Sequence, residues 1–223
     1  MIPWVQLDAA PLPEGGELRL MQRGAEFSIM AGSLELMNSR RSGSEVALAT
    51  LSAEALGPRQ SAQVLIGGLG MGFTLGAART AWGADARFTV AELVPAVVAW
   101  ARGPLAGVVG DSFEDSRVTI READVGALIR SAYAAYDAIL LDVDNGPHGM
   151  GHASNDDLYD RAGLLAARRA LRPRGVLAVW SAASDPQFVA RMRRAGFGVT
   201  EHQVRAHRGK GPRHIIWLGV SPG

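Results

Sequence analysis

The sequence predicts an α/β fold in which a parallel sheet is covered by helices on both faces and preceded by a small β-meander. From about residue 61 onward, short apolar runs alternate with helix-like segments, as expected for parallel strands joined by right-handed crossovers. The last two apolar runs, 198–205 and 214–219, are separated only by a short polar loop and therefore predict an antiparallel hairpin. The first 55 or so residues instead contain short strand-like pieces between glycine turns.

The N-terminal elements are a small meander and a linking helix. Three strand-like pieces are separated by two-residue turns that end in glycine, which favours hairpins. These pieces span 17–20, 26–30 and 33–37. A helix then begins at Ser44 and ends before Gly57 and Pro58, which stop a helix. We therefore predict an N-terminal unit at 1–57 and a Rossmann-like, nucleotide-binding domain at 58–223.

The remaining chain predicts five strands that alternate with five helices. Each strand is a short, mostly apolar run, and each helix is a longer segment with apolar positions at helical spacing. The strands are expected at 64–66, 88–91, 118–121, 138–141 and 176–180, and the helices at 71–82, 94–102, 125–131, 155–171 and 186–195. With the hairpin, this layout matches the seven-stranded, Rossmann-like fold of the class I methyltransferases.

Length and composition exclude several classes of protein. A chain of 223 residues can bury a large core, and the absence of cysteine excludes both a disulfide framework and thiolate chemistry. No apolar run is long enough to cross a membrane and no leader-like segment stands at the N-terminus, so we expect a cytoplasmic protein without membrane association. A net charge of +1 argues against a dedicated nucleic-acid binder, which would carry a strong positive field.

The most informative segment is the glycine loop at 67–72, Gly-Gly-Leu-Gly-Met-Gly. A buried strand that breaks into glycines brings a ligand against backbone rather than side chains. The tight G-x-G-x-G spacing differs from the dinucleotide pattern, which would need glycine in place of Phe73 or Leu75. The loop therefore favours S-adenosylmethionine or a relative over NAD. Its predicted ligand contacts are Gly67, Gly68, Gly70 and Gly72.

Acidic residues follow the next two strands, at the edge of the sheet where ligands of doubly wound folds bind. Glu92 ends the second strand and is followed by Leu93; an acid at this place accepts both ribose hydroxyls of a nucleotide. Asp124 follows the third strand and can accept the exocyclic amine of adenine while its neighbour Val125 packs on the ring. The alternatives are a Glu92 that is merely exposed in a turn and an Asp124 that only caps the next helix.

Two aspartates follow the fourth strand. Asp142 and Asp144, together with Asn145, enter a Gly-Pro turn directly after an apolar run. Two carboxyls this close raise each other's proton affinity, and they suit the binding or deprotonation of a cationic amine. The alternative is an Asx turn in which Asp144 and Asn145 only satisfy loop amides.

A family resemblance lies in the segment at 136–147, Tyr-Asp-Ala-Ile-Leu-Leu-Asp-Val-Asp-Asn-Gly-Pro, which resembles the strand-and-loop signature of the spermidine synthases (polyamine aminopropyltransferases). The likeness extends to the N-terminal strands, the glycine loop, Ala91-Glu92-Leu93-Val94 and Leu171-Arg172-Pro173-Arg174-Gly175-Val176-Leu177. It implies that Glu92 holds the ribose and Asp124 the adenine. It also implies that Asp142 binds the ligand amine and that Asp144 deprotonates the attacking amine. The co-substrate would be S-adenosylmethionine or its decarboxylated form, without a metal, and an aminopropyl group would pass to a small amine.

Three departures from the family pattern leave other functions open. The family's glycine loop carries an aspartate that this chain lacks, only Val143 separates the aspartate pair, and the family's Tyr-His-Glu motif is reduced to Gly-Ser-Glu at 43–45. The first alternative is methyl transfer to a small molecule, because a site for intact S-adenosylmethionine need not hold a lone amine. The second is a non-catalytic nucleotide-binding or assembly module, for which few acidic pocket residues would be typical.

Other features carry weaker interpretations. His148 and His152 have the spacing of helical metal ligands, but two glycines between them oppose a helix, so we expect no metal site. Trp180 ends the fifth strand and is either the floor of an acceptor pocket or part of the core. A basic C-terminal quarter is interpreted as a solvated surface rather than a nucleic-acid site. It comprises Arg191, Arg193, Arg194, Arg205, Arg208, Lys210 and Arg213.

The N-terminal strands also predict the oligomeric state. A few short strands cannot bury enough surface to be stable alone, so their apolar side chains need a partner surface. These side chains are Leu18, Leu20, Phe27, Ile29, Leu34 and Leu36. The rest of the chain can cover one face of the meander. We expect a second copy to cover the other, and the family resemblance also implies a homodimer.

Overall fold

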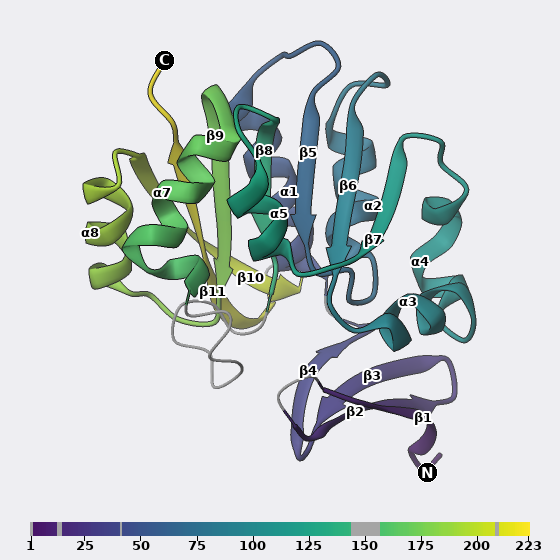
Figure 1. The fold of residues 1–223 in the computed structure, drawn as a ribbon. Coiled ribbons are helices and arrows are strands. Elements are labelled where there is room, and N and C mark those ends of the chain that lie inside the picture. The colour runs from purple at the N-terminus through teal and green to yellow at the C-terminus, as the bar shows by residue number, and fades with distance from the viewer. Residues whose placement is uncertain (1, 13–14, 41, 144–156, 208–209) are drawn as a thin grey trace.

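A four-stranded antiparallel sheet forms the N-terminal part of the structure, a computed structural model that describes residues 2–12, 15–40, 42–143, 157–207 and 210–223. Its strands follow chain order: β1 (Val5–Pro11), β2 (Glu17–Arg23), β3 (Glu26–Ala31) and β4 (Leu34–Asn38). Leu18, Leu20 and Ile29 from this sheet are buried in a core that it shares with the larger sheet. The meander lies at the end of the large sheet where strands β5, β6 and β8 finish (Figure 1).

Strand β1 is not among the elements predicted from the sequence. Only Ala10 of its seven residues is buried, whereas Val5 and Leu7 are exposed. The strand pairs with β2 along its length, with an irregularity between Gln6 and Asp8. Backbone pairing rather than core burial thus defines β1. A search for alternating apolar residues could not identify this strand, because its side chains are mostly exposed.

The large sheet has seven strands in the order β10-β11-β9-β8-β5-β6-β7. The strands are β5 (Gln63–Gly67), β6 (Arg87–Glu92), β7 (Val118–Glu122), β8 (Tyr136–Leu141), β9 (Leu171–Ser181), β10 (Gly198–His207) and β11 (Lys210–Val220). The first five run parallel, and β11 is antiparallel to both β9 and β10. This arrangement confirms the predicted fold class: a Rossmann-like parallel sheet, a C-terminal antiparallel hairpin and an N-terminal meander.

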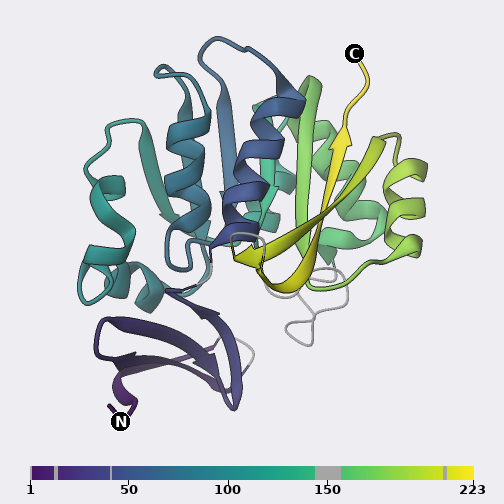
Figure 2. The same cartoon turned by 180° about the vertical axis from the view of Figure 1, so that it is seen from behind.

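Helices cover both faces of this sheet (Figures 1 and 2). On one face lie α1 (Gly43–Leu56), α2 (Phe73–Ala81), α3 (Pro95–Arg102) and α4 (Ala106–Val109) with a 3-10 turn (Gly110–Phe113); on the other lie α5 (Val125–Ser131), α7 (Arg161–Ala170) and α8 (Pro186–Arg194). The strand β5 illustrates why both faces need cover. Val64 and Ile66 belong to the core on the α1–α2 side, whereas Leu65 belongs to the core on the α5–α7 side.

Several element bounds differ from the prediction. Helix α2 begins at Phe73 rather than at residue 71, because Gly72 adopts a left-handed conformation that a helix cannot contain. Helix α7 begins at Arg161 rather than at residue 155, since the side chain of Asp160 caps it by accepting from the amide of Gly163 at 2.7 Å. The short helix α4 and the turn after it were also not predicted, because four residues cannot show a helical period.

Helix α1, which the predicted boundary assigns to the N-terminal unit, lies beside α2 over the large sheet (Figure 2). Helix α1 thus packs on the domain that follows it, and the boundary at residue 57 remains a prediction. Within the described ranges, no helix is both long enough and apolar enough to cross a membrane.

Candidate active site

The glycine loop follows β5 at the point where the strand order of the sheet reverses, between β5 and β8. Gly68, Gly70 and Gly72 have φ angles of +85°, +51° and +79°, a region that side chains strain to adopt. A Cβ atom on Gly68 would lie 2.7 Å from the carbonyl oxygen of Asp142, so the loop also packs directly against the end of β8. The sequence thus uses glycine here for both conformation and close approach.

Glu92 ends β6 and ties the glycine loop to that strand. Its Oε2 atom accepts a hydrogen bond from the amide of Leu69, and its Oε1 atom accepts one from the amide of Val94, both at 2.9 Å. The residue is buried, and burial raises the pKa of Glu92 above its usual range, while the backbone hydrogen bonds oppose that rise. Glu92 is therefore not the exposed turn residue of the alternative interpretation. Backbone hydrogen bonds from Gly70 and Leu93 also act on this carboxylate, so Glu92 is held by the loop and by the end of its own strand.

Asp124 caps helix α5. Its Oδ1 atom accepts from the amide of Gly126 at 2.8 Å, its Oδ2 atom accepts from the amide of Ala127 at 3.0 Å, and Arg130 donates to the same Oδ2 atom. The capping interpretation therefore describes the structure, and contact with adenine remains a prediction that capping does not oppose. The neighbour Val125 is buried, whereas Leu93 exposes 44% of its surface beside Glu92.

Asp142 follows β8 and faces the first turn of helix α2. Its Oδ2 atom accepts a hydrogen bond from the hydroxyl of Thr74 at 2.6 Å. Burial, followed by the negative charge of Glu45, raises the pKa of Asp142 to about 7, although the Thr74 hydrogen bond opposes this rise. Burial likewise raises the pKa of Glu45. We call Asp142 and Glu45 the acid pair: the negative charge of Glu45 acts on Asp142, and the pKa of each carboxyl lies above its usual range.

Glu45 belongs to a chain of polar side chains that leads away from the acid pair. It lies in the first turn of α1, and its Oε2 atom accepts from the hydroxyl of Ser44 at 2.8 Å. The same hydroxyl oxygen lies 2.9 Å from Nδ1 of His214 on β11. The His214 ring packs edge-on against Trp180, with 4.7 Å between ring centroids. Trp180 thus lies beside this polar chain rather than wholly within the apolar core.

Met37 of the meander covers the centre of the glycine loop. A Cβ atom on Gly70 would lie 2.5 Å from Cε and 2.8 Å from Sδ of Met37. The space into which a side chain at position 70 would project is therefore occupied by a thioether. No charged group takes that space, and the N-terminal sheet contributes directly to the surroundings of the loop.

The remaining predicted site residues are placed as follows. Asp144, Asn145, His148 and His152 lie outside the described residues. Within the described ranges, no three His, Asp or Glu residues cluster as metal ligands would. The prediction did not identify Thr74, Met37 or His214. Thr74 lies two residues after the glycine loop, and this position in the sequence could have identified it as a site residue. Met37 and His214 reach the site only through the fold.

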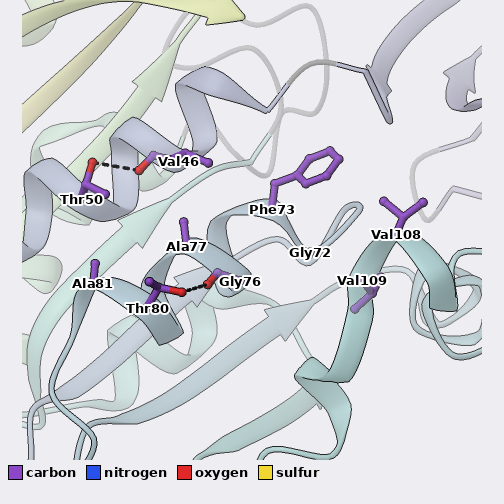
Figure 3. A pocket seen from close by; sticks show the side chains of 10 residues that line it. All are labelled: Val46, Thr50, Gly72, Phe73, Gly76, Ala77, Thr80, Ala81, Val108 and Val109. Carbon is purple, nitrogen blue, oxygen red and sulfur yellow. Dashed lines mark hydrogen bonds between the residues drawn. The ribbon is translucent and has the colours of Figure 1, made fainter. Parts of the chain in front are cut away.

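An apolar hollow of about 390 Å³ lies between α1, α2 and α4 (Figure 3), and its lining includes neither Glu92 nor Asp142. It is lined by Val46, Thr50, Gly72, Phe73, Gly76, Ala77, Thr80, Ala81, Val108 and Val109. The hydroxyls of Thr50 and Thr80 bond to carbonyls of their own helices, at 3.0 and 3.2 Å. None of the lining residues is charged, so the hollow lacks groups for acid–base chemistry.

Comparisons with known proteins give a structural likeness without a sequence match. No family model matches the chain, and no curated protein matches it. The structure is similar to that of a spermidine synthase in complex with the transition-state analogue AdoDATO, with a TM-score of 0.75 and 16% sequence identity; the match covers 96% of this chain and 72% of that chain. It is also similar to the spermidine synthase from Thermotoga maritima, with a TM-score of 0.76, 15% identity and the same two coverages.

These likenesses establish the fold. The chain has a Rossmann-like fold with an N-terminal meander, and its candidate site lies at the carboxyl edge of the parallel strands. That fold is spermidine synthase-like over nearly the whole chain, as the sequence resemblance implies.

Proposed function

We propose that this chain is a cytoplasmic transferase of polyamine metabolism that binds decarboxylated S-adenosylmethionine, or S-adenosylmethionine, and transfers an aminopropyl group to a small amine. The observation that carries the proposal is the acid pair. Two carboxyls that act on each other electrostatically suit the binding of a cationic amine, because its positive charge offsets their repulsion. The fold resemblance to spermidine synthases supports the same class of reaction.

The glycine loop and the acids at the strand ends fit an adenosine group. The loop presents backbone where side chains are excluded at Gly68 and Gly70. Glu92 places a carboxylate next to that backbone, and this carboxylate is the predicted acceptor for the ribose hydroxyls. Asp124 and Val125 lie after the neighbouring strand, where an adenine ring would extend along the sheet edge. We therefore assign nucleotide binding to Gly67, Gly68, Gly70, Gly72, Glu92, Leu93, Asp124, Val125 and Asp142.

The acid pair would act on the acceptor amine. An ammonium ion is not a nucleophile, so one proton must leave before its nitrogen can attack the carbon next to the sulfonium of the co-substrate. Asp142, with a pKa of about 7, is suited to hold the amine and to exchange a proton near neutral pH. Asp144 remains the predicted base for this step, and Thr74 would orient Asp142 through its hydrogen bond. Positioning of the two substrates would supply much of the rate.

Methyl transfer is a second candidate, and Met37 is the observation that favours it. The spermidine synthase pattern has an aspartate within the glycine loop, whereas here a thioether fills the space beside Gly70. An uncharged group at this place gives no ion pair to the lone amine of a decarboxylated co-substrate. Such a site is compatible with intact S-adenosylmethionine, whose methyl group would then be transferred.

Product analysis distinguishes these reactions. The purified protein is incubated with decarboxylated S-adenosylmethionine or S-adenosylmethionine and a panel of diamines, and products are identified by mass spectrometry. Aminopropyl transfer yields methylthioadenosine and an amine that is heavier by one aminopropyl group. Formation of S-adenosylhomocysteine would instead favour methyl transfer. Nucleotide binding without either product would support the non-catalytic alternative.

A further inference from the structure

The polar chain from the acid pair to His214 has a definite proton order. Ser44 has one hydroxyl proton, and an ionised Glu45 can only accept a hydrogen bond. With Glu45 ionised, the Ser44 proton therefore lies on the 2.8 Å bond to Oε2 of Glu45. The Ser44 oxygen must then accept from His214, so the 2.9 Å bond requires a proton on Nδ1 of His214.

When Glu45 is protonated, the order reverses. Glu45 can donate to the Ser44 oxygen, and Ser44 can donate to an unprotonated Nδ1 of His214. The two orders are related by one concerted shift. The O–H bond of Glu45 breaks as its proton passes to Ser44, the original O–H bond of Ser44 breaks, and an N–H bond forms at Nδ1 of His214. Glu45 gains one negative charge, and His214 gains one positive charge.

We propose that Ser44 and His214 form a proton relay that removes from Glu45 of the acid pair the proton passed on by the base that deprotonates the acceptor amine. The relay rests on the proposed function for the source of this proton. The direction of its hydrogen bonds, in contrast, is a property of the protein without substrate. Ser44 is 1% exposed, so water cannot replace its hydroxyl without movement of α1. His214 is only partly buried and can pass the proton on to solvent.

The surroundings of His214 suit this role. Trp180 of β9 fixes the ring from the side, and Val204 is its partner on β10. The charged groups reached through Ser44 are Glu45 and Asp142, both acidic. Arg205 and Arg213 occupy the next rung of the β10–β11 ladder, where successive side chains point to opposite faces. The positive charge that His214 gains in the proton shift is matched by the negative charge that Glu45 gains at the other end of the chain of hydrogen bonds.

The tautomer of His214 tests the direction of these hydrogen bonds independently of any reaction. Nitrogen-15 NMR of the intact protein is measured from pH 5 to 9, with the His214 signal assigned from a His214→Gln variant. At the high end of this range, neutral His214 is expected in the Nδ1–H form, which is the form that an ionised Glu45 requires, and Ser44→Ala is expected to abolish that preference. An Nε2–H form in the unmodified protein, or no change in Ser44→Ala, would overturn the relay.

Kinetics then test the transport of the proton. Ser44→Ala and His214→Gln are expected to lower kcat by on the order of tenfold and to change its pH profile, with nucleotide affinity unchanged. His202→Gln, on the neighbouring strand, is the matched control and should leave both properties unaltered. If both relay variants keep the full kcat and pH profile, the relay is wrong. If the unmodified protein transfers no group at all, the proposed function fails. The NMR result still decides the direction of the hydrogen bonds between His214, Ser44 and Glu45.

Discussion

Replacing Asp142 by asparagine should make the protein more stable at alkaline pH. In the folded chain, burial and Glu45 raise the pKa of Asp142 from 3.8 to about 7. An unfolded chain releases this proton near pH 4, so between about pH 4 and 7 the folded state binds more protons than the unfolded state. The free energy of unfolding therefore falls as pH rises through this window and becomes level above it. Asparagine carries no charge and removes this dependence.

The magnitude follows from the same pKa change. A rise from 3.8 to about 7 corresponds to about 4 kcal/mol between the charged and neutral carboxyl. Asp142 keeps part of its surface exposed, and part of the rise comes from the charge of Glu45, whose own pKa is raised by burial. We therefore expect about 2 kcal/mol of this difference to appear as lost stability of the unmodified protein between pH 5 and 8.

Urea unfolding at pH 5, 6, 7 and 8 measures this effect. The stability of Asp142→Asn relative to the unmodified protein should increase by about 2 kcal/mol across this range. Asp111→Asn is the matched control: Arg79 lowers the pKa of the exposed Asp111, which is thus ionised throughout. Its effect should not change with pH. Parallel stability curves for Asp142→Asn and the unmodified protein would refute the account of the acid pair.

Four further outcomes are expected. Glu92→Ala should weaken nucleotide binding by about 2 kcal/mol in calorimetry, since a charged acceptor for the ribose is lost, and unchanged affinity would contradict this assignment. Asp144→Asn should lower turnover by about a hundredfold with nucleotide binding spared, whereas loss of binding would indicate a structural loop. Asp137→Ala should cost about 3 kcal/mol in urea unfolding, because this fully buried carboxylate pairs with two arginines, and a loss below 1 kcal/mol would contradict that role. Light scattering at micromolar concentration should give a dimer formed through the meander, and a monomer would remove that prediction.

The carboxyl edge of the sheet was predictable because strand ends are marked in the sequence. Glu92, Asp124 and Asp142 each follow a run of mostly apolar residues, and parallel strands bring such ends to one edge. Local pattern was therefore sufficient to bring Glu92 and Asp142 beside the glycine loop, whereas a role for Asp124 there remains a prediction. The sequence pattern could not show that Glu92 accepts a hydrogen bond from the loop or that Asp124 caps α5.

The rest of the site depends on contacts between distant parts of the chain. His214 reaches Ser44 across 170 residues, because the C-terminal hairpin returns to the start of α1. Met37 reaches Gly70 because the meander folds over the edge of the sheet. Neither contact has a periodic or spacing signal. The acid pair has the same origin, since Glu45 lies in the first turn of α1 and Asp142 follows β8.

Titration calorimetry of the intact protein with S-adenosylmethionine, its decarboxylated form and methylthioadenosine tests the central claim most directly. The glycine loop, Glu92 and the strand-end acids predict saturable binding of at least one of these ligands with one site per chain. The same titration with Glu92→Ala should show the affinity reduced by about 2 kcal/mol. Absence of heat and of competition for all three ligands at millimolar concentration would contradict the assignment of this edge of the sheet as an S-adenosyl nucleotide site.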